Sequence, residues 1–554
     1  MPRRADRGRD GRRAAVRGSQ ALLEALALFA VYLAALLVVY APALRGPFFS
    51  DDLHYVATNP YVHALTLENL RQILDPASPA SVFVVNYTPV HLLLHALAWR
   101  AFGPDVLGHH VLNLALHAAG SVLLVGVFRA SGIGRLAALA GGTLFVLHPA
   151  NVEAVAWISQ TKTVSCFVLS MATLLLFPKR PGLATPAFFL ALLAKPTGAF
   201  LLPVAGMLAF VRLWRGAPPW RHLVWLGVWV AGFLVVSIAQ VEVNRRSGTP
   251  DAGLGLEGLE RIPLVFGIAL RYLWMSATSL GVSAFHEPPK HASFADPAFL
   301  VSIPILAVCA VRAVRSVIGR REEAVYWVLA ASSFAPISQI FPFLYPMADR
   351  YLYFILPGLI GVALFVLRDL ETALPAAFRE PATRAAIVLA LVLCVVFAVR
   401  GHARAELFGN PALLLVDAAR NYPGGVSANL LRARGAAREG DVRAAIEALE
   451  AARARGWNRF EQLENDPVWD PIRSDPRFRG LVREIAAWWI ERSEQLENPT
   501  QMELRVRAIA HLARGERDLA IESLEAALAR GGPIDERIRE ELAELRRGSP
   551  QPSR

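Results

Sequence analysis

The sequence predicts an all-α protein in two parts, a polytopic helical membrane domain followed by a soluble helical domain. Of the 554 residues, 54% are hydrophobic and only 19% are charged, against about 45–50% and about 25% in typical soluble domains. Long apolar runs fill residues 21–400, whereas Arg, Glu and Ala dominate from Gly401 onward. This composition excludes a soluble enzyme and indicates where the membrane part ends.

The first apolar run, residues 21–42, sets the expected orientation. It has the roughly 20 apolar residues that a transmembrane helix needs and is longer than the core of a removable signal peptide. Seven arginines and only two aspartates precede it, within residues 1–20. Because basic segments stay in the cytoplasm, residues 1–20 are predicted to be a basic cytoplasmic tail. The loop after the first span is then outside.

Further apolar runs bring the expected number of spans to about eleven. They lie at residues 21–42, 109–128, 135–150, 160–177, 183–195, 196–212, 222–240, 297–314, 324–343, 350–367 and 384–400. The apolar runs 88–102 and 262–280 carry histidine or arginine and are expected at the membrane surface. With this count the basic clusters between spans fall on the cytoplasmic side, except Arg245, Arg246 and Lys290. An odd number of spans places the C-terminal domain outside.

The C-terminal part is predicted to consist of a linker, residues 401–425, and a helical domain, residues 426–548. Two stretches of this domain share a spacing of small and large apolar residues. They are Gly440, Ala445, Leu449 and Ala452, and Gly515, Ala520, Leu524 and Ala527. A Gly that ends one helix and an Ala that lets the next helix pack closely are typical of the tetratricopeptide repeat (TPR). A generic Ala-rich helical bundle is the alternative.

The first outer loop carries adjacent carboxylates, Asp51 and Asp52, among aromatic residues and close to His54. A carboxylate in such a place can serve as a general base or as a metal ligand. Alternatively, Ser50 or Asp51 caps the N-terminus of a short helix.

Other polar groups are expected at the same face of the membrane. They are His148, Glu153, Lys162, Lys195, Asp349 and Arg350. Ionisable side chains near the hydrocarbon edge are costly without partners, which makes them candidate site residues. Asp349 either caps a helix and pairs with Arg350, or Arg350 presents its planar guanidinium to a phosphate. Carboxylates and cations at one face suit a lipid-phosphate substrate.

Several motifs together resemble a known family. They are Ser50–Pro60, Asn86–Pro89, Asn113–His117, His148–Ser159, Ala194–Gly198 and Asp349–Tyr353. Their order and spacing are similar to those of the transmembrane and TPR-containing O-mannosyltransferases and their bacterial relatives, within the GT-C glycosyltransferase superfamily. The resemblance covers residues 20–400, and the helical-repeat tail extends it.

The resemblance implies transfer of a sugar from a polyprenyl-phosphate donor to an acceptor hydroxyl, with inversion. Asp51 and Asp52 match the catalytic acidic pair. The substrate-binding set is expected to comprise His54, His148, Glu153, Lys162, Lys195, Asp349 and Arg350. Relatives usually carry a basic residue and an Asp where this chain has Thr161 and Thr163. An inactive membrane scaffold with a partner-binding tail therefore stands as the alternative, followed by a transporter or flippase.

The expected partners are a polyprenyl-phosphate-linked sugar, a protein or glycan acceptor, the membrane and a protein bound by the tail. Nucleic acid is not expected, because much of the +11 net charge lies in cytoplasmic anchors. The sequence predicts no certain cofactor, with a divalent cation as the one candidate. The Arg, Ala and Leu bias is typical of a bacterial protein. This places the chain in the inner membrane, with its N-terminus cytoplasmic and its C-terminal domain periplasmic.

Overall fold

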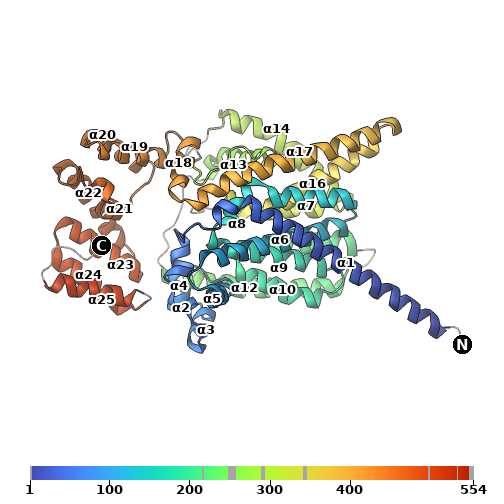
Figure 1. Cartoon of the computed structure of the whole chain (residues 1–554), viewed down its shortest axis with the longest axis horizontal. Coiled ribbons are helices and arrows are strands. Elements are labelled where there is room, and N and C mark those ends of the chain that lie inside the picture. Colours follow the sequence, from blue (N-terminus) through green and yellow to red (C-terminus); the bar gives the residue numbers. More distant parts are fainter. Residues whose placement is uncertain are drawn as a thin grey trace.

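The computed structural model describes residues 3–214, 218–247, 258–288, 293–340, 346–496, 499–532 and 534–547. Every regular element within these ranges is a helix, so the predicted all-α class is confirmed (Figure 1). Up to residue 18 the side chains of the basic tail lie outside the described part. The helices form a long bundle, and the C-terminal helices lie beyond one end of it.

The bundle is built from the longer helices of the N-terminal part. They are α1 (Arg3–Val39), α6 (Val106–Ala130), α7 (Arg135–Leu147), α9 (Thr161–Leu176), α10 (Pro181–Ala194), α11 (Leu201–Leu208), α12 (Trp220–Ser247), α13 (Arg261–Thr278), α14 (Pro297–Ile318), α15 (Glu323–Phe334), α16 (Leu352–Ala373) and α17 (Ala376–Gly409). Central helices bury apolar side chains such as Ala118, Phe167 and Leu192. Outer helices such as α12, α14 and α17 leave most apolar side chains exposed.

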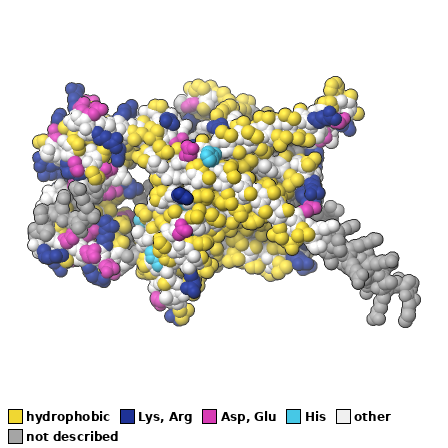
Figure 2. Space-filling view, in the orientation of Figure 1, with side chains coloured by type: hydrophobic (Ala, Val, Ile, Leu, Met, Phe, Trp, Pro, Cys, Tyr) yellow, Lys and Arg dark blue, Asp and Glu magenta, His cyan; other side chains and the backbone are white. Residues whose placement is uncertain are grey.

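Seven helical segments are long and apolar enough to cross a membrane. Each coincides with a predicted span: Ser19–Val39, Val106–Ala130, Pro196–Leu213, Trp220–Arg246, Pro297–Ile318, Asp349–Ala373 and Ala376–Gly409. Hydrophobic side chains form a broad band over the bundle (Figure 2). The protein is therefore an integral membrane protein.

The four other predicted spans fall on shorter helices, α7, α9, α10 and α15, of 13, 16, 14 and 12 residues. Residues 341–343 of the predicted span 324–343 lie outside the described residues. Of the described helices, neither α5 (Pro89–Phe102) nor α13 meets the length and hydropathy of a span. The total of about eleven stays a prediction.

One end of the bundle carries the loop of residues 43–105, and we call it the loop end. The helices there are short: η1 (Ala41–Ala43), η2 (Leu53–Ala57), α2 (Pro60–His63), α3 (Leu67–Leu74), α4 (Pro79–Phe83), α5, η3 (Pro149–Asn151), α8 (Val152–Ala156), η4 (Ile158–Gln160), η5 (Pro196–Phe200), η7 (Gly258–Glu260), η8 (Ala335–Ile337) and η9 (Asp349–Tyr351). Several of these helices are capped at their N-termini by a side chain. Asn59, Thr66 and Ser78 accept hydrogen bonds from backbone amides of α2, α3 and α4 respectively.

The opposite end of the bundle gathers the basic clusters that the sequence assigns to the cytoplasmic side. Arg212, in η6 (Ala209–Leu213), forms an ion pair with Glu322 at 2.7 Å. Arg312 pairs with buried Glu323 at 2.5 Å and with Asp369 at 2.9 Å. These contacts place Arg212 and Arg312 at a common end of the bundle, and the orientation of that end stays a prediction.

The C-terminal helices are α18 (Ala412–Asn421), α19 (Val426–Arg438), α20 (Val442–Arg453), α21 (Phe460–Asn465), η10 (Pro467–Trp469), α22 (Pro476–Glu494), α23 (Gln501–Arg514), α24 (Arg517–Arg530) and α25 (Asp535–Arg547). The segment 401–425 differs from the predicted linker. It contains the end of α17 and α18, and it buries Ala405, Phe408 and Leu414 in the core of the bundle. Apolar residues at helical spacing explain why this segment packs.

The two stretches with matched spacing form two helical pairs, α19 with α20 and α23 with α24. Gly440 and Gly515 follow the first helix of each pair with φ of +74° and +83°, a conformation that glycine adopts without strain. Ala445 and Ala520 are fully buried in the second helices. The local geometry expected from the spacing is present, and the TPR assignment itself remains a proposal.

Candidate functional site

Three segments far apart in the sequence meet at the loop end of the bundle. They are the start of the first loop (residues 48–59), the segment from η3 to the start of α9 (residues 148–163) and η9 (Asp349–Tyr351). The Phe49 ring stacks on Trp157 at 5.5 Å. The backbone amide of Arg350 donates to Glu153 at 2.8 Å. These contacts bring together most of the site residues that the sequence predicts.

Asp52 is buried and tied to the backbone. One carboxylate oxygen accepts a hydrogen bond from the Ser159 amide at 2.6 Å, and the other accepts one from the Phe49 amide at 3.3 Å. Burial raises the pKa of Asp52 to about 7, although the two backbone donors oppose this shift. With 1% of its surface exposed, Asp52 fixes the first loop against the segment that contains Glu153 and Trp157.

Asp51 is partly exposed and has a different environment. Within the ranges described above, its carboxylate accepts no hydrogen bond and forms no ion pair, and Ser50 caps no helix. Asp51 lies close enough to interact electrostatically with Arg350 and His54. The capping alternative is therefore not what the structure shows, and Asp51 is the accessible carboxylate of the pair.

Arg350 and Glu153 form a buried ion pair. The Arg350 side chain donates to one Glu153 oxygen while its backbone amide donates to the other. The guanidinium also lies over the rings of Trp157 and Tyr351, at 5.4 and 5.1 Å from their centroids. The side chain stays 16% exposed. Arg350 is thus held in a fixed orientation with part of its charge still accessible.

Lys162 and Lys195 supply two further positive charges. The Lys162 ammonium lies 4.2 Å from the centroid of the Tyr55 ring. Lys195 donates to Thr163 Oγ1 at 2.8 Å. Among the residues that the structure describes, neither ammonium has a carboxylate within ion-pair distance. The two lysines interact electrostatically with each other, and Lys195 also with Arg350 and Glu153. We call Asp51, Glu153, Lys162, Lys195 and Arg350 the loop-end cluster.

Asp349 has other partners than its neighbour Arg350. Its carboxylate accepts from Arg404 at 3.0 Å, from His286 Nε2 at 2.7 Å and from the Ser283 amide at 3.2 Å. It therefore joins η9 to α17 and to the segment after α13.

The contacts of the two predicted histidines lie mainly outside the loop-end cluster, although His54 interacts electrostatically with Asp51. His148 is buried; its Nδ1 accepts from the Ala150 amide, and its ring packs edge-on against Phe397. His54 keeps much of its surface exposed, and its ring packs edge-on against Phe83. Partial desolvation of this ring lowers the pKa of His54.

Several residues around the cluster were not among the predicted site residues. Tyr55 and Trp157 provide the rings under Lys162 and Arg350. His91 and His95 are fully buried, are joined by an Nε2–Nε2 hydrogen bond of 2.7 Å, and lie beside Tyr55. A signal was present in the sequence, because two histidines four residues apart share one face of a helix.

The divalent cation that the sequence left as a candidate stays a prediction. Across the described residues, no group of three or more His, Cys, Asp or Glu side chains converges as metal ligands would. Both oxygens of Asp52 already accept backbone amides. The arrangement instead offers one accessible carboxylate beside an excess of fixed cations, which suits an anionic substrate whose reaction partner must lose a proton.

Comparison with known proteins gives two curated relatives. Over 146 residues, 25% of its length, the chain is 32% identical to the protein O-mannosyl-transferase Tmtc1 of Drosophila melanogaster. Over 188 residues, 32% of its length, it is 25% identical to the protein O-mannosyl-transferase F38B6.6 of Caenorhabditis elegans. The matched parts span 16% and 27% of those relatives.

No known family profile matches the chain, and no solved structure does. The two relatives nevertheless carry the family name that the sequence motifs indicate. The chain therefore resembles the transmembrane and TPR-containing O-mannosyltransferases, as its motifs predict.

Proposed function

We propose that this protein is a membrane glycosyltransferase of the GT-C type. It moves a mannose-like sugar from a polyprenyl-phosphate donor to an acceptor hydroxyl at the extracytoplasmic face. The names of the two relatives support sugar transfer. Within the structure, the loop-end cluster supports it most strongly.

The observation that carries the proposal is the charge balance of this cluster. The three basic side chains Lys162, Lys195 and Arg350 outnumber the two carboxylates of the cluster, Glu153 and Asp51, and Glu153 pairs with only one of the three. A phosphate group supplies the missing negative charge, and fixed cations stabilise the charge that develops on it as it leaves. Asp51 is the accessible carboxylate beside them and matches the requirement for a general base.

In the proposed reaction, the acceptor oxygen attacks the anomeric carbon on the face opposite to the phosphate. The new bond from the acceptor oxygen to the anomeric carbon forms as the bond from that carbon to the phosphate oxygen breaks. The hydroxyl proton moves to Asp51, and the electron pair of the broken bond leaves with the polyprenyl phosphate. Lys162, Lys195 and Arg350 stabilise that anion, and Asp52 positions the loop that carries Asp51.

The direct test gives purified full-length protein a radiolabelled polyprenyl-phosphate mannose and a mixture of peptides containing Ser and Thr. Wild type is expected to label the peptides, and Asp51→Asn is expected to lose the transfer. Asp52→Asn serves as the comparison for a purely positional effect. If the wild type transfers no label to any acceptor, or if Asp51→Asn matches it, the catalytic assignment fails and a membrane scaffold becomes the better account.

Orientation has a separate test. The loop end and the C-terminal helices are proposed to face the extracytoplasmic side, the bacterial periplasm. A reporter enzyme active only in that compartment, fused after residue 547, is expected to be active. An inactive fusion would contradict the predicted odd number of spans.

A further inference from the structure

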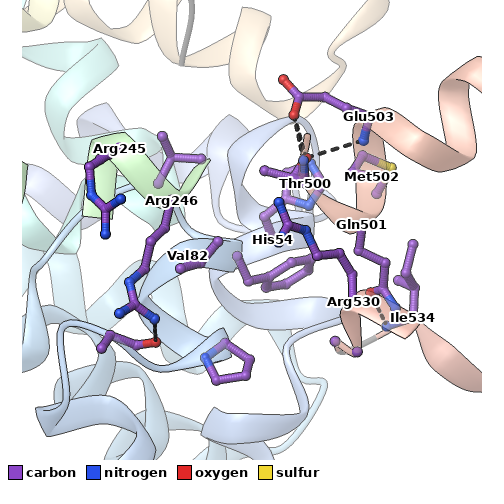
Figure 3. Close-up of a pocket in the computed structure, with 16 residues that line it drawn as sticks. His54, Val82, Arg245, Arg246, Thr500, Gln501, Met502, Glu503, Arg530 and Ile534 are labelled. Carbon is purple, nitrogen blue, oxygen red and sulfur yellow. Dashed lines mark hydrogen bonds between the residues drawn. The ribbon is translucent and has the colours of Figure 1, made fainter. Parts of the chain in front are cut away.

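A cavity lies between the first loop and the C-terminal helices. Its volume is about 660 Å³, within the range of ligand-binding pockets. It is lined by the first loop around α4, by the end of α12, by the start of α23 and by the residues at and after the end of α24. Figure 3 shows His54, Val82, Arg245 and Arg246 on one side and Thr500, Gln501 and Arg530 on the other.

The wall formed by the first loop is apolar. Pro79, Val82, Phe83 and Val85 line it, and Met502 and Ile534 face it from the C-terminal helices. Gly531 and Gly532 also line the cavity. The Gln501 side chain covers Gly532, whereas the space beside Gly531 is open, so an occupant can approach the backbone closely at Gly531. Apolar side-chain contacts combined with an accessible backbone suit an extended polypeptide better than a sugar chain, which needs many polar partners.

The charge at the rim is positive. Arg245 and Arg246 share a single carboxylate, Glu242, and their side chains are 63% and 44% exposed. On the opposite wall, Arg530 interacts electrostatically with Glu503, whose carboxylate also accepts from the amide and hydroxyl of Thr500. The excess positive charge therefore comes from Arg245 and Arg246 beside the single Glu242, and an occupant with acidic side chains compensates it.

The cavity adjoins the loop-end cluster. His54 lines it and follows Asp51 by three residues, in the turn where η2 begins. Asp51 and His54 also interact electrostatically. A chain lying in the cavity therefore has a short path to the accessible carboxylate.

We propose that this cavity binds the acceptor as an extended polypeptide with apolar and acidic side chains. This inference rests on the proposed function, since it assigns the acceptor class of the same site. The first loop and the C-terminal helices each supply one wall, so both are needed for acceptor recognition.

The test uses detergent-solubilised full-length protein and two fluorescein-labelled nonapeptides. One alternates Val or Leu with Ser and contains two Asp residues; the other has Lys in place of both Asp. Fluorescence anisotropy is expected to show at least tenfold tighter binding of the acidic peptide. Met502→Trp and Val82→Trp, which fill the cavity from its two walls, are expected to weaken that binding at least tenfold. Leu519→Trp, on the exposed face of α24, is the matched control and should not change it.

Equal affinity for both peptides, or full affinity in Met502→Trp and Val82→Trp, overturns the proposal. Displacement of the acidic peptide by short-chain phosphatidylglycerol, but not by excess unlabelled peptide, also overturns it, because the cavity would then hold a lipid headgroup. Asp51→Asn keeps the two hypotheses distinct, since it is expected to bind the peptide while losing transfer. Binding without transfer in wild type contradicts the proposed reaction alone; transfer that both Trp variants leave intact contradicts the cavity alone.

Discussion

The two ends of the helical bundle both carry arginine or lysine, but they use the charge differently. At the opposite end, Arg212 pairs with Glu322, and Arg312 and Arg321 share Glu323 and Asp369. At the loop end, Lys162 and Lys195 have no carboxylate within ion-pair distance among the described residues, although their ammonium groups lie close to aromatic rings. The arginines named at the opposite end have carboxylate partners, whereas the two lysines of the loop end have none among the described residues.

The difference separates structural charge from functional charge. A cation paired with a carboxylate at a membrane boundary anchors the helix, and the attraction between the two charges offsets the free-energy cost of removing them from water. A fixed cation without such a partner is costly unless a ligand compensates it, which makes it a candidate binding group. The helix α16 connects the two ends of the bundle. Arg350, at the loop end, precedes its first turn, and Asp369, which pairs with arginines at the opposite end, lies in its last turns.

The largest expected effect is that of Asp51→Asn on sugar transfer. Loss of a general base lowers the rate by about 10²–10⁴-fold. Asp52→Asn is expected to lower it less, because an asparagine oxygen still accepts one backbone amide. Single-turnover transfer of radiolabelled mannose measures both. A larger loss in Asp52→Asn than in Asp51→Asn would reverse the assignment of the base.

Next in size is the effect of removing the uncompensated cations. Lys162→Met and Lys195→Met are each expected to lower kcat/KM by about 10²-fold, since each removes a group that stabilises the leaving phosphate. Lys179→Met is the matched control, because Lys179 is an exposed lysine just beyond the other end of α9. Equal losses in all three variants would show that the two ends do not differ in function.

Breaking a matched pair at the opposite end should affect stability rather than transfer. Arg312→Met leaves the fully buried Glu323 with Arg321 as its remaining cation at 3.5 Å. We expect the free energy of unfolding to fall by about 1–3 kcal/mol, with the KM for the donor unchanged. Thermal unfolding in detergent and steady-state kinetics give the two quantities. A changed KM with unchanged stability would contradict the structural role.

Asp52 makes stability depend on pH. Its folded-state pKa of about 7 exceeds the ordinary value of 3.8, so between these values the folded protein binds more protons than the unfolded chain. Stability from this group therefore falls as pH rises from about 4 to about 7. In Asp52→Asn this contribution is absent, so between about pH 4 and about pH 7 its unfolding temperature should fall by a few degrees less than that of the wild type. Identical pH profiles for both proteins would exclude the effect.

The smallest effect is expected for an exposed pair, Arg384 with Glu380, whose side chains are 75% and 76% exposed. Pairs of this kind contribute about 0.3–0.5 kcal/mol at most. Arg384→Ala should leave unfolding temperature and transfer almost unchanged. A loss as large as that of Arg312→Met would mean that exposure does not separate the two classes of pair.

Much of the fold could be predicted, because it depends on local sequence. Apolar runs of sufficient length located seven helical segments that the structure confirms. Local capping also begins helical segments at Asp466 and Asp475, whose side chains accept hydrogen bonds from backbone amides just after them. The packing of residues 401–425 was not predicted, because their apolar side chains contact parts of the bundle that are remote in sequence.

The sequence identified which residues belong to the site, but not which residue each of them contacts. Adjacent carboxylates gave no means of telling Asp51 from Asp52, since their difference depends on the Ser159 amide 107 residues away. Likewise Arg350 pairs with Glu153, 197 residues away, rather than with its neighbour Asp349. Helix packing decides such contacts, and a single sequence does not contain that information.

The most direct test of the central claim, that the loop end holds the donor phosphate, is a binding measurement with polyprenyl monophosphate. Full-length protein is titrated with this lipid in detergent while thermal unfolding is followed. Wild type and Lys179→Met are expected to be stabilised as the lipid saturates them, whereas the double variant Lys162→Met/Lys195→Met is expected to show no stabilisation. Equal stabilisation of the double variant and wild type would contradict the claim.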